Sequence, residues 1–190
     1  MKKNLIMIMA VVIMCLFVCT LVSCDNEPAA TTAPATTTAP ATTTAPAVIE
    51  GVKEYKDDYI SFAYPEELEK GVVGGITMLS GTNGNNITVV TEPVSDMYKT
   101  LTADEFMALV GPTYEAMGMS VSNLSVEQLK NALGTEITKI AMTTTSAGVS
   151  MTQTVYVVKS GDLNVSVTVT ETVKDAKMVA DVYATIKALK

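Results

Sequence analysis

The clearest alternation of apolar and polar residues lies near the end of the chain and predicts a β-strand at 163–171. Leu163, Val165, Val167 and Val169 are apolar, whereas every residue between them is polar. Successive side chains of a strand point to opposite faces, so this pattern predicts one buried face and one solvent-facing face. Runs rich in Thr, Val and Ser predict further strands near 121–128, 135–145 and 150–159. Residues 126–133 also suit a helix, so the first of these strands has an alternative.

Earlier in the chain, short alternating segments predict two hairpins. The first pairs strands at 52–55 and 59–64, and the second pairs strands at 76–80 and 86–91. Pro65 stops the second strand, after which residues 66–70 are expected to form a helical turn. The glycines of residues 71–75 predict a flexible loop, and Asn83-Gly84 is a strong turn signal in the second hairpin.

Two segments have helical spacing. Thr102 and Glu105 match a capping box ahead of apolar residues from Phe106 to Met117, which predicts the start of a helix. Pro112 conflicts with an unbroken helix, so the helix either kinks at Gly111-Pro112 or restarts there. A second helix is predicted from about residue 174, with its basic end suited to the helix dipole. Its apolar stripe consists of Val179, Val182, Tyr183, Ile186 and Leu189. Lys187 and Lys190 form its basic end.

Strands joined by short turns, with helices between and after them, indicate an α+β fold. We expect an antiparallel β-sheet packed with helices in an α/β sandwich over residues 48–190.

The chain begins with the features of an export signal. Lys2 and Lys3 precede an apolar run that continues to Val22. The run reaches the lower length limit for a membrane-spanning helix, so an uncleaved anchor is the alternative. Leu21-Val22-Ser23-Cys24 resembles the lipobox of bacterial lipoproteins. The resemblance implies a signal peptide at 1–23, cleavage before Cys24, and attachment of lipid such as palmitate to Cys24.

Residues 24–47 join this predicted anchor to the domain. From residue 29 onwards they contain only Ala, Thr and Pro, with Pro34, Pro40 and Pro46 at six-residue intervals. Such a segment has no apolar face to bury, so we expect a disordered, extended linker. The linker would hold the domain away from a membrane.

Composition narrows the function further. The net charge is −7, the chain has no His, and all of its basic residues are Lys. This acidic charge balance argues against nucleic-acid binding. Histidine chemistry is excluded, and we predict no cofactor, no metal site and no catalytic residue. Lys159-Ser160-Gly161 is similar to an element of penicillin-interacting serine enzymes, but the Ser-x-x-Lys that must accompany it is missing, so a turn is expected.

Two larger groups of residues have a structural interpretation and a functional one. Acidic residues cluster between 50 and 69, where a solvated face is expected rather than a Ca²⁺ site. Five of the seven tyrosines are expected in the core rather than in a binding patch. They are Tyr55, Tyr59, Tyr98, Tyr114 and Tyr156.

The run from Tyr55 to Pro65, an aromatic-rich strand that ends in Tyr64-Pro65, resembles the start of PsbP-like and DcrB-like domains. The second hairpin, the helix after Thr102, the long meander that Gly134 opens and the last helix also fit this resemblance. Glu66-Glu67-Leu68 departs from relatives that have a Trp after the Tyr-Pro. The resemblance implies an α/β sandwich with docking or accessory roles, similar to the extrinsic photosystem II subunit PsbP and to small envelope lipoproteins.

Together these features predict a lipoprotein anchored in the cell membrane and facing its extracytoplasmic side. We expect a binding or accessory module rather than an enzyme, with the membrane and an envelope protein as partners. A structural or assembly role in an envelope complex is the alternative. A hydrolase that uses Ser or carboxylate residues ranks third.

Overall fold

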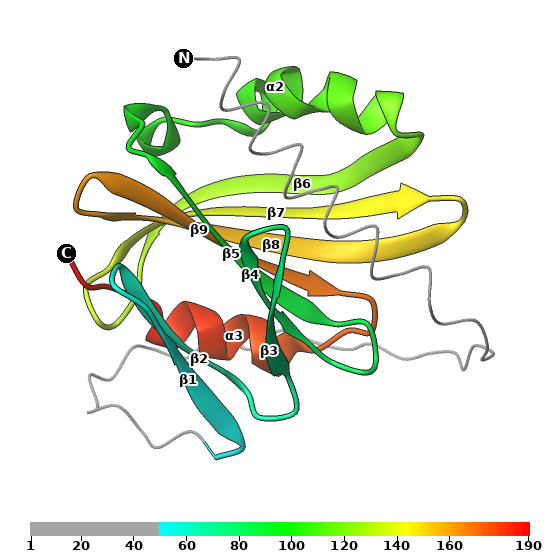
Figure 1. Cartoon of the computed structure of the whole chain (residues 1–190). Helices are drawn as coiled ribbons and strands as arrows, with labels where there is room; N and C mark the ends of the chain where they lie inside the picture. The colour runs from blue at the N-terminus through cyan, green and yellow to red at the C-terminus, as the bar shows by residue number, and fades with distance from the viewer. Residues whose placement is uncertain (1–49) are drawn as a thin grey trace, which may run out of the picture.

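The computed structural model describes residues 50–190 (Figure 1). The predicted signal peptide, Cys24 and the linker over residues 24–47 lie outside the described residues. No helix within residues 50–190 combines the length and the apolar character needed to cross a membrane.

Seven strands form one large antiparallel sheet in the order β3-β4-β5-β9-β8-β7-β6. The hairpin strands are confirmed, although several bounds move by a few residues. The strands are β3 (Glu69–Val73), β4 (Ile76–Ser80), β5 (Asn86–Pro93), β6 (Met119–Lys130), β7 (Glu136–Ser146), β8 (Val149–Ser160) and β9 (Leu163–Glu171).

A second, smaller sheet has the order β1-β2-β10. Its strands are β1 (Val52–Lys56), β2 (Ile60–Pro65) and β10 (Lys187–Ala188). In Figure 1 the helix α2 (Ala103–Ala116) lies on one side of the large sheet, whereas α3 (Ala176–Thr185) and the small sheet lie on the other. The α+β sandwich expected from the sequence is therefore confirmed.

The core has two parts, one on each face of the large sheet. On one face, Phe106, Val110 and Tyr114 of α2 pack against Ile140 and other apolar residues of β7 and β8. On the opposite face, residues of α3 and the small sheet pack against Val165, Val167 and Val169 of β9. These three valines are fully buried, as their alternation predicted.

The expectation of a solvent-facing side on β9 is wrong. Asn164, Thr168 and Thr170 are 1–4% exposed. β9 lies at the centre of the sheet, between β5 and β8. A strand inside a layered fold has both faces shielded, so its polar residues are buried along with its valines.

Residues 66–75 do not form a helical turn followed by a loop. Glu69–Val73 is the edge strand β3, paired with β4, and Gly74-Gly75 forms the turn between them. All five residues of β3 are exposed, so the apolar alternation that identifies a strand is absent. Leu68, just before β3, is buried in the core on the α3 side of the large sheet.

Two helical predictions also change. Residues 126–130 belong to β6, so the helical alternative for 126–133 is wrong. The last helix ends at Thr185, because Ile186 is extended and Lys187–Ala188 pair with β2. Lys187 and Lys190 therefore do not lie in the last turn of a helix.

The capping box at α2 is confirmed. The backbone N–H of Glu105 donates to Thr102 Oγ1, and the Glu105 carboxylate accepts from the backbone N–H of Thr102. Pro112 lies inside one continuous helix, which does not restart there.

Candidate functional site

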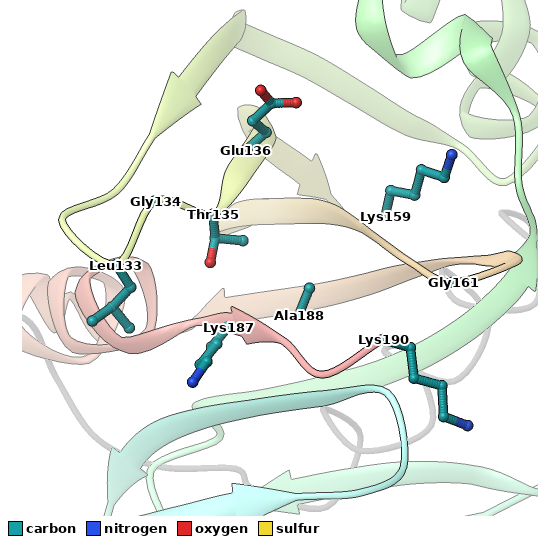
Figure 2. A pocket seen from close by; sticks show the side chains of 9 residues that line it. All are labelled: Leu133, Gly134, Thr135, Glu136, Lys159, Gly161, Lys187, Ala188 and Lys190. Atoms are coloured by element: carbon teal, nitrogen blue, oxygen red, sulfur yellow. The ribbon is translucent and has the colours of Figure 1, made fainter.

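A pocket among residues 50–190 lies where the large sheet meets the small one (Figure 2). Its volume is about 540 Å³. Its walls come from the turn between β6 and β7, the turn between β8 and β9, and the C-terminal segment. Figure 2 shows these segments surrounding the pocket, with charged side chains along its margin.

Asn131 builds the first wall by fixing the turn between β6 and β7. Its side-chain oxygen accepts hydrogen bonds from the backbone N–H groups of Leu133 and Thr135. Its amide nitrogen donates to the carbonyl oxygens of Tyr183 and Ile186 at the end of α3. One buried amide therefore holds the turn and terminates the helix.

Ser160 builds the opposite wall. Its hydroxyl donates to the carbonyl oxygen of Tyr59 over 2.6 Å and accepts from the backbone N–H of Lys190 over 3.2 Å. Gly161 also donates its N–H to the Lys190 carbonyl. With φ at +60°, Gly161 begins the hairpin turn between β8 and β9. Lys159 and Ser160 are the last paired residues of β8, so only Gly161 of the predicted turn lies in it.

Three lysines, Lys159, Lys187 and Lys190, line this pocket together with Glu136. None of the three lysines has an ion-pair partner within 4 Å in the described part of the chain. The ammonium group of Lys190 lies 4.0 Å from the centroid of the Tyr59 ring, a cation–π contact. In Figure 2, Lys187 and Lys190 extend toward the small sheet, whereas Lys159 and Glu136 extend to the opposite side.

A second pocket of about 320 Å³ also has Glu136 and Lys159 in its lining. The short helix η2 (Asp96–Lys99) supplies another part of its wall, including Tyr98. The two pockets together form the candidate functional site, which we call the sheet-end groove.

Next to the second pocket, Tyr98 meets the buried carboxylate of Glu92. Both residues are 5% exposed. The Tyr98 hydroxyl donates to Glu92 Oε1 over 2.5 Å, and Glu92 Oε2 has no hydrogen-bond partner. Burial raises the pKa of Glu92, although the hydrogen bond from Tyr98 opposes this shift. Burial and the nearby carboxylate raise the pKa of Tyr98.

Glu92 belongs to a larger group of buried oxygens on the α2 face of the sheet. Asn86, Thr170 and Gln153 are direct neighbours on β5, β9 and β8. A buried acceptor without a hydrogen-bond partner costs about 1–3 kcal/mol of folding free energy. A group that donates hydrogen bonds to this face of the sheet would remove part of that cost. The oxygens without a partner are Asn86 Oδ1, Thr88 Oγ1, Glu92 Oε2, Thr144 Oγ1, Gln153 Oε1 and Thr170 Oγ1.

The other candidates from the sequence do not gather at this groove. Among residues 50–190, no cluster of acidic or sulfur side chains has the arrangement of a metal site. Most of the early acidic residues are exposed, as expected of a solvated face. Asp57 instead holds a turn, because it accepts the backbone N–H groups of Tyr59 and Ile60. Four of the five tyrosines are buried, which confirms the core interpretation.

Sequence reasoning missed Glu92, Asn131 and the shared position of the lysines. Glu92 follows a β-branched run, which was a signal of a buried environment. Asn131 precedes a turn, where asparagine is common. The lysines lie in separate elements, so their proximity depends on the pairing of β10 with β2.

No protein-family model matches the sequence, and neither does any curated protein. Solved structures do match. The solution structure of cyanobacterial PsbP (CyanoP) from Synechocystis sp. PCC 6803 is 13% identical, with a TM-score of 0.56. The match covers 74% of this chain and 94% of that chain. The fold is PsbP-like.

A crystal structure from Bacteroides thetaiotaomicron VPI-5482 also matches, at 14% identity and a TM-score of 0.48. It covers 74% of this chain, and the match spans about half (49%) of that longer chain. At 13% identity, the match to CyanoP establishes the PsbP-like fold alone and assigns no ligand to the sheet-end groove.

Proposed function

We propose that this protein is a lipoprotein held on the extracytoplasmic side of the cell membrane through Cys24. Its PsbP-like domain then acts as a binding or accessory module for an envelope protein. The observation that carries the proposal is the sequence Leu21-Val22-Ser23-Cys24, placed directly after a charged start and an apolar run.

Elementary energetics supports a double lipid anchor of this kind. Each buried CH₂ group contributes about 0.8 kcal/mol, so a single acyl chain binds a membrane only marginally and two chains hold stably. The 23 residues from Asp25 to Ala47 would span about 70 Å in an extended polyproline conformation. A domain on such a tether can search a wide area around its anchor.

The anchor is tested by feeding cells a labelled fatty acid and isolating the full chain. We expect the wild-type protein to incorporate the label and Cys24→Ala to lose it. Cys15→Ala and Cys19→Ala are matched controls, because both cysteines lie within the signal peptide that cleavage removes. A Cys24→Ala protein that still carries label would refute acylation at this residue.

The sheet-end groove is the surface that we assign to the partner. Its lysines offer three ammonium groups without ion-pair partners among residues 50–190, on a chain of net charge −7. Ammonium groups at an open pocket attract carboxylates, which steer the approach of a partner and fix its orientation. We therefore propose an acidic segment of an envelope protein as the occupant.

Site-specific crosslinking in intact cells tests this assignment. A photoreactive residue at Leu133, which is 46% exposed and lines the groove, should give a discrete adduct. The control is Val149, 58% exposed at the opposite end of β8. Lys159→Gln with Lys187→Gln should weaken the Leu133 adduct. Equal adducts from Leu133 and Val149, or an adduct that ignores the lysines, would remove the groove from the proposal.

A further inference from the structure

Residues 94–99 form a wall of the smaller pocket. Tyr98 attaches this segment to the sheet, and the backbone N–H of Val94 also donates to the carbonyl oxygen of Asp162. The Tyr98 hydroxyl donates to Glu92 on β5. The Tyr98 carbonyl oxygen accepts from Gln128 Nε2 over 2.8 Å and from Thr138 Oγ1 over 2.9 Å. One residue therefore connects this wall to β5, β6 and β7.

The bond between Tyr98 and Glu92 depends on the charge of Glu92. An ionised carboxylate at this site has one hydrogen-bond donor, and its second oxygen is buried without a partner. Burying a charge without full compensation is costly, whereas a protonated carboxyl avoids most of that cost. Ionisation of Glu92 therefore favours any conformation that lets water reach the carboxylate.

No charged neighbour offsets this cost among the described residues. The cross-strand neighbour is Asn164, whose amide donates to the Ser95 carbonyl oxygen over 3.4 Å. Lys159 pairs with Asn164 on its other side, and Asp96 and Lys99 form an exposed ion pair with each other. The pKa of Glu92 is raised by burial and lowered by Tyr98, in that order of size.

We propose that Glu92 and Tyr98 form a pH-sensitive latch. With Glu92 protonated, the latch holds residues 94–101 against the sheet. As Glu92 ionises, the latch releases this segment and widens the smaller pocket of the sheet-end groove. The inference rests on the proposed function only in assigning the pocket to a partner, since the motion itself requires none.

The direction and size of the pH effect on the latch follow from the linkage between proton binding and conformation. Because the closed form binds the Glu92 proton more tightly than an open, hydrated form does, rising pH shifts the population toward the open form. Each unit of pKa difference between the two forms corresponds to about a tenfold change in the closed-to-open ratio.

Amide hydrogen exchange of residues 94–101 tests the latch in the full chain. After correction for intrinsic exchange, wild-type protection should fall as pH rises through the raised pKa of Glu92. Glu92→Gln should stay protected across the same range, because the amide oxygen still accepts from Tyr98 and carries no charge. Glu54→Gln, at an exposed site on β1, should follow the wild type. Tyr98→Phe should lose protection at every pH.

A second measurement covers the case in which Glu92→Gln does not fold. In the wild-type chain, the carboxyl ¹³C signal of Glu92 and the amide signals of residues 94–101 should titrate with one midpoint. Wild-type protection that is independent of pH, separate midpoints, or equal profiles for Glu92→Gln and wild type would each overturn the latch. If the segment responds to pH but no adduct forms at Leu133, the proposed function fails and the latch stands.

Discussion

At the scale of single residues, the hydrogen bonds of buried polar groups connect the segments of this molecule more than its exposed charges do. Asn131 connects a turn to the end of α3, and Ser160 connects β8 to the C-terminal segment. Glu92 differs from these two residues, because one of its two oxygens is buried without a partner. A buried carboxylate in this state opposes folding at any pH where it is ionised.

The consequence for stability has a definite sign. The folded state raises the pKa of Glu92, so it binds the proton more tightly than the unfolded state. Stability from this group is fully present below the unfolded pKa and is lost as pH rises through the folded pKa. At pH values above the raised pKa of Glu92, where the wild-type carboxylate is charged, Glu92→Gln should therefore unfold with a free energy about 1 kcal/mol higher than wild type.

Urea unfolding at several pH values measures this difference. The advantage of Glu92→Gln should shrink as pH falls below the raised pKa of Glu92, whereas Glu54→Gln should show no such trend. An equal pH dependence for wild type and Glu92→Gln would mean that Glu92 ionises alike in the folded and unfolded states.

At the scale of elements, local sequence signals and tertiary packing together determine where a helix begins and how far it continues. The capping box starts α2 at the residue that local chemistry selects, and the helix then continues through Pro112. Pro112 is exposed, and Val110 and Tyr114 on either side of it are buried against the sheet. Packing of this apolar face stabilises the helix against the interior proline, which alone costs about 3 kcal/mol.

At the scale of the whole molecule, the junction of the two sheets determines where the groove lies. The carbonyl oxygen of Tyr59 accepts from both Ser160 and Leu189, and Lys190 donates to Ser160. These bonds hold the small sheet, the large sheet and the C-terminal segment in one arrangement. Each of these three parts supplies one lysine of the larger pocket: Lys159 from the large sheet, Lys187 from the small sheet and Lys190 from the C-terminal segment.

Ser160→Ala tests this junction. Ser160 is fully buried, so its loss leaves the Lys190 N–H without its acceptor and removes one donor to Tyr59. We expect the free energy of unfolding to fall by about 1–3 kcal/mol. The C-terminal segment should also be cleaved faster by protease in native conditions. Ser120→Ala, at an exposed position on β6, should change neither. A Ser160→Ala protein as stable as wild type would show that the junction does not depend on this hydroxyl.

The sequence by itself determined the class of fold, most strands, the start of α2 and the core tyrosines. These features rest on local physics, namely the two-residue period of strands, turn residues and capping. For the same reason, the export signal and Cys24 are predictions from local sequence alone.

The edge strand β3, the end of α3 and the groove were decided only by the tertiary structure. Edge residues need no apolar alternation, and Ile186 ends its helix because the following residues pair with β2. The groove collects side chains from segments far apart in the chain, and the unpaired oxygen of Glu92 depends on which strands are neighbours. Long-range pairing fixes such features, and no local pattern encodes it.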